Sequence, residues 1–307
     1  MIDYKKIIKS RRLRLAILKF FSFIPDRWML KLQYRIKTGR KLNLKDPKRY
    51  TEKLQWYKLF YRNPLMPKCV DKGDARDYVK ECGLEDTLNE CYGIFDRVED
   101  IDFDALPDKF VVKNTLGGGG NSVVIVKDKS KLNIPELKER MSAWITENAH
   151  AKDAGREWPY YSGRAHGRII IEKYIESDES RGGLIDYKFF CFNGKTEWVY
   201  VMAERKLGED VCIDIYDADF NKLKYKRAGK NNTDVCIEKL KNFEELKKTA
   251  ERLSKGFPHV RVDMYDQDDK IIFGELTFYE GSGYVSFDPD EFDYIMGEKF
   301  ILPERNN

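Results

Sequence analysis

Alternating apolar and polar residues mark the two clearest strand pairs of the chain. Residues 260–265 (VRVDMY) and 270–277 (KIIFGELT) both alternate, and the acidic run 266–269 between them has the composition of a turn. A period of two residues is typical of half-buried strands, so we predict that these segments pair. A second hairpin is predicted at 186–192 and 196–204, because Asn193-Gly194 between them favours a tight turn.

Helical spacing of apolar residues and short apolar runs complete the predicted elements. We expect helices at 4–24, 26–38, 51–62, 74–82, 135–148 and 243–255, and buried strands at 110–113, 123–126 and 168–175. Thr51 is expected to cap its helix, and Gly83 to follow the end of another. The polar connection 149–167 has the length of a lid or substrate loop.

The composition is that of a globular protein with a substantial core. The 307 residues are 42% hydrophobic and 35% charged, with 18 Tyr and 18 Phe. A net charge of +4 does not indicate a nucleic-acid partner. Six cysteines without metal-site spacing and only three histidines argue against a zinc hydrolase or a histidine-based triad, and they favour a reduced, cytoplasmic setting.

The basic excess is concentrated at the N-terminus. Between Lys5 and Lys19 the chain has seven Lys or Arg and no acidic residue, mixed with apolar positions. The most apolar part, 15–24, is too short for a bilayer, which takes about 20 residues. Two interpretations remain open: residues 1–24 lie on an anionic membrane surface, at the inner face of the cell membrane, or they pack on the main domain with a solvated basic face.

Candidate chemistry begins with the carboxylates of the last strand pair. Asp263 and Glu275 should stand close together, and two carboxylates repel unless a cation lies between them. Hard oxygen ligands suit Mg²⁺ carrying a nucleotide phosphate. Arg261 points to the same face as Asp263 and could hold a phosphate through two hydrogen bonds. The alternative is a solvated hairpin whose charges lie on its wet face.

Other segments offer contacts for a nucleotide. Four consecutive glycines at 117–120 are costly in chain entropy unless the backbone must approach something closely, such as phosphate; a mobile surface hairpin is the alternative. Lys113 ends the preceding strand, and Lys72 lies at a helix entrance, where it is either solvated or a phosphate contact. Alternation at 186–190 directs Lys188 to one strand face. The end of strand 168–175 could read a purine edge through its backbone, or it simply reaches the surface.

The order of these motifs resembles the ATP-grasp superfamily, and specifically its TupA-like branch, named for teichuronopeptide biosynthesis. The likeness spans 25–303 and is closest at 52–64 (EKLQWYKLFYRNP), 186–195 (DYKFFCFNGK) and 260–283. It implies an α+β fold in which two antiparallel lobes enclose ATP. The implied divisions are a helical N-terminal region at 1–65, the first part of the core at 66–108, a nucleotide-binding lobe at 109–176 and a metal-binding, catalytic lobe at 177–307.

The resemblance also implies roles for individual residues. It assigns the nucleotide to two lysines, a phosphate-covering loop and an adenine-binding hinge: Lys72 and Lys113; Gly117, Gly118, Gly119, Gly120, Asn121 and Ser122; and Glu172, Lys173 and Tyr174. It assigns Mg²⁺ to Asp263 and Glu275, with Thr277 where the superfamily often has Asn. Arg261 would contact the γ-phosphate and the acyl phosphate, and Lys188 is added as a second catalytic phosphate contact.

The implied activity is that of an ATP-dependent carboxylate–amine ligase. ATP and Mg²⁺ are the expected cofactors. The expected partners are a carboxylate-bearing glycan or peptide acceptor and an amine donor, in the making of a cell-surface polysaccharide such as a capsule. A glycosyltransferase that uses a sugar nucleotide is the alternative enzyme, and a nucleotide-binding scaffold without activity is the third interpretation. The concentration of charge at Arg261, Asp263 and Glu275 argues against the scaffold.

Overall fold

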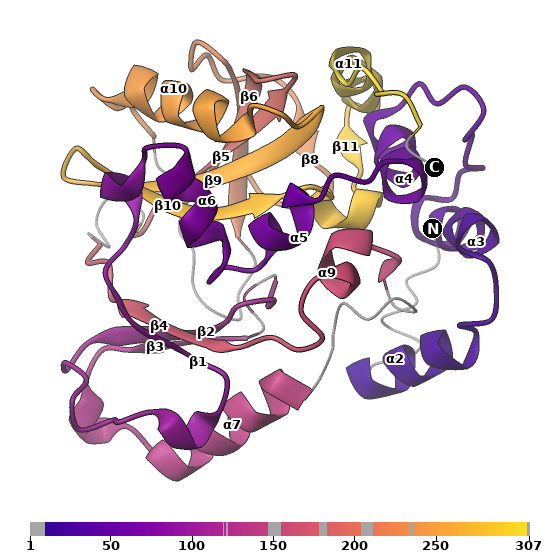
Figure 1. Cartoon of the computed structure of the whole chain (residues 1–307). Helices are drawn as coiled ribbons and strands as arrows, with labels where there is room; N and C mark the ends of the chain where they lie inside the picture. Colours follow the sequence, from indigo (N-terminus) through magenta and orange to yellow (C-terminus); the bar gives the residue numbers. More distant parts are fainter. Residues whose placement is uncertain are drawn as a thin grey trace.

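Two antiparallel sheets, one above the other in Figure 1, form the framework of the molecule. The computed structural model describes residues 10–118, 120, 122–146, 155–177, 183–203, 211–233 and 236–305. Each sheet has its own cluster of buried apolar side chains, and short helices lie between the sheets (Figure 1). The expected α+β architecture is therefore confirmed.

The smaller sheet has the strand order β1-β4-β2-β3. Its strands are β1 (Cys91–Phe95), β2 (Phe110–Asn114), β3 (Val123–Val126) and β4 (Ile169–Lys173). Helix α7 (Ile134–Thr146) packs against it through Leu137 and Met141, which are fully or almost fully buried. Strand β4 ends at Lys173, two residues earlier than expected from the apolar run.

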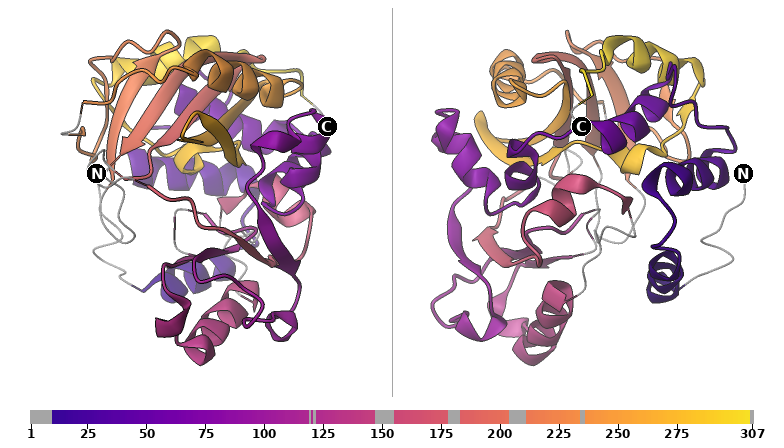
Figure 2. Two further views of the ribbon diagram at one scale, coloured as in Figure 1. Left: turned by 90° about the vertical axis from the view of Figure 1, so that its left-hand side faces the viewer. Right: turned by 45° about the vertical axis from the view of Figure 1, so that its right-hand side comes forward.

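The larger sheet has the strand order β10-β9-β5-β6-β7. Its strands are β5 (Asp186–Phe192), β6 (Lys195–Ala203), β7 (Cys212–Asp217), β9 (His259–Gln267) and β10 (Lys270–Thr277). Alternation separates two faces: Phe189 and Val262 lie on the face toward α10 (Phe243–Ser254), and Lys188 and Asp263 lie on the opposite face. Helix α10 lies on the side of the larger sheet away from the smaller sheet (Figure 2). Both predicted hairpins are confirmed.

Turn residues explain how the hairpins close. Asn193 and Gly194 both have positive φ, of 51° and 79°, as a two-residue hairpin turn requires. Asp268 and Asp269 adopt φ of 52° and 65°, so the turn between β9 and β10 is only these two residues. Gly83, with φ of 63°, follows the last turn of α6 as predicted.

Helices of the N-terminal and C-terminal regions pack beside the larger sheet, except the first of them, α2, which lies apart from it (Figure 1). They are α2 (Arg11–Phe20), α3 (Asp26–Thr38), α4 (Tyr50–Phe60), α5 (Leu65–Val70), α6 (Ala75–Glu81) and α11 (Glu291–Lys299). The prediction of Thr51 as N-cap is wrong. Thr51 lies inside α4, and its backbone N–H and hydroxyl both donate to Asp293 of α11, so a carboxylate distant in sequence satisfies this helix start.

Short elements complete the chain. They are α9 (Trp158–Ser162), the two-stranded pair β8 (Lys226–Arg227) and β11 (Phe287–Asp288), and the 3₁₀ turns Glu85–Thr87, Val98–Asp100, Lys129–Lys131 and Glu280–Gly283. The connection 149–167 is thus partly helical, which the sequence did not indicate. Strand β1, from the segment 66–108, pairs with β4, so that segment contributes to the smaller sheet. The division of the chain into four parts remains an interpretation.

Candidate active site

Three strands of the larger sheet bring charged side chains into one row. In the β9–β10 pair Asp263 lies opposite Glu275, and in the β5–β9 pair it lies opposite Lys188. Lys188 forms an ion pair with Asp263 and another with Asp186, whose Oδ2 is 2.6 Å from the Lys188 Nζ. The row lies on the face directed at the smaller sheet. Asp186 takes part because it lies two residues before Lys188 on the same strand face, a spacing that the sequence displays.

A bulge at Gly274 sets the spacing of the two carboxylates. The strand register shifts between Phe273 and Glu275. A Cβ added at Gly274 would lie 2.9 Å from the backbone oxygen of Asp263, closer than side-chain carbons normally come to backbone. The absence of a side chain therefore allows β10 to approach β9 where Glu275 meets Asp263.

Arg261 lies at the centre of this row and is buried. Its Nε donates to Asp263 Oδ1 at 2.6 Å, and its Nη2 donates to Asp263 Oδ2 at 2.7 Å. The same Nη2 donates to the hydroxyl of Thr277 at 3.1 Å and lies 3.6 Å from Glu275 Oε1, while Nη1 pairs with Glu280. The guanidinium thus lies against all three expected metal ligands, Asp263, Glu275 and Thr277. It also contacts Glu280, which follows β10.

The cations of the site control the charge of Glu275. Burial by itself raises a carboxyl pKa, but Lys72, Lys188 and Arg261 outweigh it and hold the pKa of Glu275 far below its usual range. For Arg261, burial alone would lower the pKa, and the charges of Asp263 and Glu275 instead raise it. Glu275 and Arg261 are therefore both ionised at neutral pH.

Lys72 connects the larger sheet to the glycine loop. Its Nζ donates to the backbone oxygen of Gly117 at 2.6 Å and lies 3.1 Å from Glu275 Oε2. Its backbone N–H donates to Thr115 at 3.0 Å. Of the two interpretations of Lys72 left open by the sequence, the solvated one does not hold, since the side chain is largely buried between the two sheets.

The glycine loop closes the hairpin between β2 and β3. The backbone N–H of Asn114 donates to Ser122, and that of Gly117 donates to Asn114, both at 3.0 Å. A Cβ at Gly117 would lie 2.9 Å from the Cβ of Ser122, and Gly120 has a φ of 75°. These two glycines are thus required by close approach and by conformation. Two residues assigned to this loop, Gly119 and Asn121, lie outside the described residues.

The smaller sheet holds Lys113 and Glu172 as an ion pair. Lys113 Nζ donates to Glu172 Oε2 at 2.7 Å, and Arg76 lies 3.2 Å from Glu172 Oε1. Lys173, next along β4, turns outward and pairs with Glu90. Tyr174 follows the strand. Of the expected hinge, the Glu172 side chain thus points toward the residues between the sheets, and the Lys173 side chain points away from them.

A comparison of the whole sequence with protein-family models decides the relationship. Residues 52–301 match the model described as "TupA-like ATPgrasp". The chain belongs to the TupA-like ATP-grasp family. The resemblance inferred from the sequence motifs is thereby confirmed, as is the expected ATP-grasp fold. No curated protein sequence matches this TupA-like chain significantly.

Solved structures similar to this TupA-like chain include ligases. D-alanine–D-alanine ligase from Bacillus anthracis is 20% identical, with 69% of this chain and 57% of that chain covered, at a TM-score of 0.44. The corresponding ligase from Helicobacter pylori is 14% identical, with 78% and 60% covered, at 0.40. ATP-grasp ligase PsnB with minimal precursor, Mg and ADP is 13% identical, with 91% and 68% covered, at 0.40. The chain thus spans less than two thirds of the length of either D-alanine–D-alanine ligase, and TM-scores below 0.5 do not transfer a substrate.

Asp71 is a structural support of the TupA-like site that the sequence did not reveal. This buried carboxylate accepts from the backbone N–H groups of Gly73 and Asp74, from the Thr115 hydroxyl at 2.7 Å and from Arg168 at 2.8 Å. Because it fixes the turn that carries Lys72 to the glycine loop, it sets where the Lys72 ammonium can reach. Its side-chain partners, Thr115 and Arg168, are 44 and 97 residues away, so no local motif could have indicated these two contacts.

The turn Glu280–Gly283 is held from behind by α4. Lys58 Nζ donates to the backbone oxygen of Ser282 at 2.9 Å, and the Gln55 side chain donates to Ser282 and Gly283. Ser282 has a φ of 55°, a conformation that few residues other than glycine adopt readily. These contacts hold the turn whose Glu280 meets Arg261. The sequence did not indicate these contacts, because a lysine within a helix, such as Lys58, is normally expected to be solvated.

Proposed function

We propose that this protein is an ATP-dependent carboxylate–amine ligase. The observation that carries the proposal is the row of Lys188, Asp263 and Arg261, which are buried, and Glu275, which is partly exposed. Lys72 joins this row to a glycine loop of the facing lobe. Family membership supports the use of ATP. ATP with Mg²⁺ would supply the γ-phosphoryl group that turns a poorly electrophilic carboxylate into an acyl phosphate, which an amine then attacks to form an amide with release of phosphate.

The residues fit a magnesium ion shared with a nucleotide. Among the described residues, no three His, Cys, Asp or Glu side chains are grouped as a complete metal site. Mg²⁺ commonly binds through one or two carboxylates, with phosphate oxygens and water as its other ligands. Asp263 and Glu275, opposite each other on β9 and β10, supply two such oxygens, and the Thr277 hydroxyl a weaker third.

The cations of the site would bind and neutralise the phosphates. Arg261 is suited to the γ-phosphate because its planar group offers several donors in a fixed geometry. Lys188 would add a second charge beside it. Lys72 and Lys113 would hold the nucleotide from the two sides of the glycine loop, which would cover the phosphates. Glu172, Lys173 and Tyr174 would contact the adenine base. These groups contribute position and charge.

The substrates we propose are a carboxylate of a cell-surface polysaccharide, or of its precursor, and an amino acid or other amine. A peripheral contact of residues 1–24 with the inner face of the membrane belongs to the same proposal and is supported by the basic residues of that segment. None of the helices in the described part of the chain has the length and apolar character needed to cross a membrane.

The decisive experiment measures ADP and phosphate separately in the presence of Mg²⁺ and ATP, with pooled amino acids and uronic-acid glycans. Amine-dependent release of both products supports ligase chemistry, and omission of single components identifies the substrates. If ATP is not consumed and UDP is instead released from a sugar nucleotide, the protein is a glycosyltransferase and the ligase proposal is rejected.

A further inference from the structure

Helix α3 has apolar side chains on two opposite faces. The inward face packs Met29, Leu30 and Tyr34 in the core. On the outward face, Trp28, Leu32 and Ile36 follow one another at intervals of four residues, with exposed fractions of 63%, 50% and 39%. A surface helix needs only one apolar face to pack, so the outward stripe serves no purpose within the described fold.

Exposed apolar residues are concentrated around this stripe. Among the described residues, eleven large hydrophobic side chains are exposed, and seven of them lie between 13 and 36: Leu13, Phe20, Phe21, Phe23, Trp28, Leu32 and Ile36. They come from α2, α3 and the turn between them, which lie on the same side of the molecule (Figure 1). We call these seven residues the N-terminal face. Such clustering marks a surface that binds a partner.

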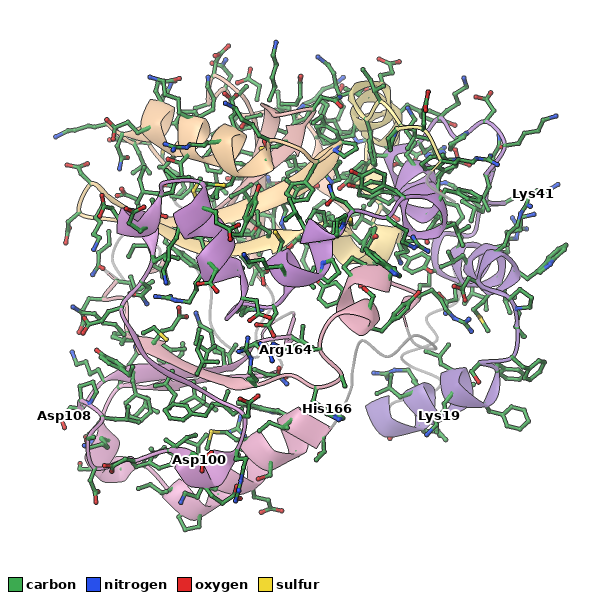
Figure 3. All side chains as sticks on the ribbon, viewed as in Figure 1. Lys19, Lys41, Asp100, Asp108, Arg164 and His166 are labelled. Atoms are coloured by element: carbon green, nitrogen blue, oxygen red, sulfur yellow. The ribbon has the colours of Figure 1, made fainter. Side chains whose placement is uncertain are left out.

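The N-terminal segment of the sequence is strongly basic, whereas the rest of the chain is acidic. Residues 1–41 include thirteen Lys or Arg and two Asp, a net charge of +11, so the remaining residues carry a net charge of −7. A hollow of about 400 Å³ beside the stripe is lined by Lys31, Arg35, Lys41 and Leu42. Lys19 and Lys41 lie on the same side of the molecule (Figure 3).

Helix α3 is fixed to the catalytic lobe. The Tyr34 hydroxyl is hydrogen-bonded to the Thr51 hydroxyl at 2.9 Å, and the Tyr284 hydroxyl donates to Gln33 at 2.6 Å. The Lys37 ammonium lies 4.0 Å from the centre of the Tyr284 ring. Helix α3, which carries the stripe, is therefore held against the lobe that carries Arg261, and docking through α3 would set the orientation of the active site.

We propose that the N-terminal face docks on an anionic phospholipid surface, with its aromatic residues among the acyl chains and lipid phosphates at the hollow. The proposal extends beyond residues 1–24, because it assigns the contact to α3, and it is independent of ligase activity. A second copy of the chain is a poorer occupant. A symmetric dimer through this face would bring two segments of charge +11 together.

Vesicle flotation of the full chain tests the proposal. We expect binding to vesicles of phosphatidylcholine and phosphatidylglycerol in equal parts, weakening as salt is raised, and little binding to phosphatidylcholine alone. Trp28→Ser combined with Leu32→Ser should weaken binding about tenfold or more while leaving residues 1–24 intact. Lys31→Glu combined with Lys41→Glu should weaken it similarly.

Ile301→Ser is the matched control, since it removes a side chain of similar exposure, 66%, outside the N-terminal face. It should bind vesicles as the wild type does. ATP turnover without vesicles should be the same in all variants, which separates this test from that of the ligase. The proposal is overturned if the wild type does not bind anionic vesicles, or if the paired variants bind them as well as the wild type does. It is also overturned if sedimentation shows that Trp28→Ser with Leu32→Ser converts a dimer to a monomer.

Discussion

Arg261 is the residue on which most of the site's charge converges. It contacts Asp263, Thr277 and Glu280 by hydrogen bonds and faces Glu275 at 3.6 Å. Such a residue positions its neighbours as well as any ligand. Its removal should therefore affect catalysis more than a change at an equally charged surface position.

We expect Arg261→Ala to lower the ATP turnover number by about 100- to 1,000-fold, because one preorganised positive charge at the reacting phosphate is lost. The measurement is steady-state release of ADP, with circular dichroism to verify folding. Arg97→Ala, an exposed position paired only loosely with Glu99, is the control and should keep full turnover. Near-normal turnover in a folded Arg261→Ala protein would refute the role.

His259 makes the fold sensitive to acid. It is fully buried, and its Nδ1 lies 2.9 Å from the backbone oxygen of Cys191, so Nδ1 carries the hydrogen and Nε2 accepts from the Tyr50 hydroxyl at 3.0 Å. Burial lowers the pKa of His259 to about 3. Below about pH 6.5 the His259 imidazole is protonated in the unfolded chain but stays neutral in the folded chain. Stability is therefore lost as pH falls from 6.5 toward 3.

The wild type should accordingly lose about 2 kcal/mol more unfolding free energy between pH 7 and pH 5 than His259→Gln does, at about 1.4 kcal/mol per pH unit. Urea unfolding at the two pH values measures this difference. His166→Gln, which removes an exposed histidine, should follow the wild type. Equal pH dependence of wild type and His259→Gln would show that His259 is not held neutral.

At the scale of elements, α4 supports the turn Glu280–Gly283 through a buried cation. The Lys58 side chain is fully buried, lies 3.3 Å from Glu157 and donates to the backbone of Ser282. Burial lowers its pKa, and the charge of Glu157 opposes that effect. Lys58 thus joins α4, the segment before α9 and the turn Glu280–Gly283.

Lys58→Met should destabilise the protein by about 3 kcal/mol, because Glu157 would lose its nearby counter-charge in a buried place. Adding Glu157→Gln should recover part of the loss. Urea unfolding provides both values, and Lys131→Met, which breaks an exposed ion pair, should cost less than about 1 kcal/mol. If the two losses simply add, the pair is not energetically coupled.

Local patterns predicted the elements whose signals are local. The hairpins β5–β6 and β9–β10 follow from alternation and turn residues, and they carry Lys188, Asp263 and Glu275 into register. Helix α11 was missed because tertiary contacts stabilise it. Gly297 in its last turns allows the backbone near Lys48 to approach, since a Cβ there would lie 2.0 Å from the Lys48 oxygen. The contacts of Asp71 with Thr115 and Arg168, and that of Lys58 with Ser282, were missed because these partners are distant in sequence.

At the scale of the whole molecule, the two lobes have separate cores. Met141 belongs to the core of the smaller sheet, and Leu246 to that of the larger, and both are fully buried. Lys72, which reaches both the glycine loop and Glu275, is one of the contacts between the lobes. The lobes should therefore open and exchange amide hydrogens as distinct units.

Met141→Ala should raise hydrogen exchange in β1 to β4 and α7 and leave β5, β9 and α10 nearly unchanged. The cavity costs about 2–5 kcal/mol, and that cost falls on the lobe that contains it. Leu246→Ala should give the reverse pattern. Mass spectrometry of exchanged peptides measures both, and a uniform rise across the two lobes would mean that they unfold as one unit.

The pairing of cations and carboxylates around Asp263 has a consequence for how nucleotide binding and metal binding depend on each other. In the absence of ligands the cations and the carboxylates of the site already neutralise each other through ion pairs. A nucleotide arriving without a divalent ion would draw Lys72, Lys188 and Arg261 away and leave buried carboxylates uncompensated. A divalent ion that binds without a nucleotide would draw the carboxylates away and leave Lys72, Lys188 and Arg261 without their counter-charges. We therefore expect thermodynamic linkage: each should bind far more tightly when the other is present, and by the same factor.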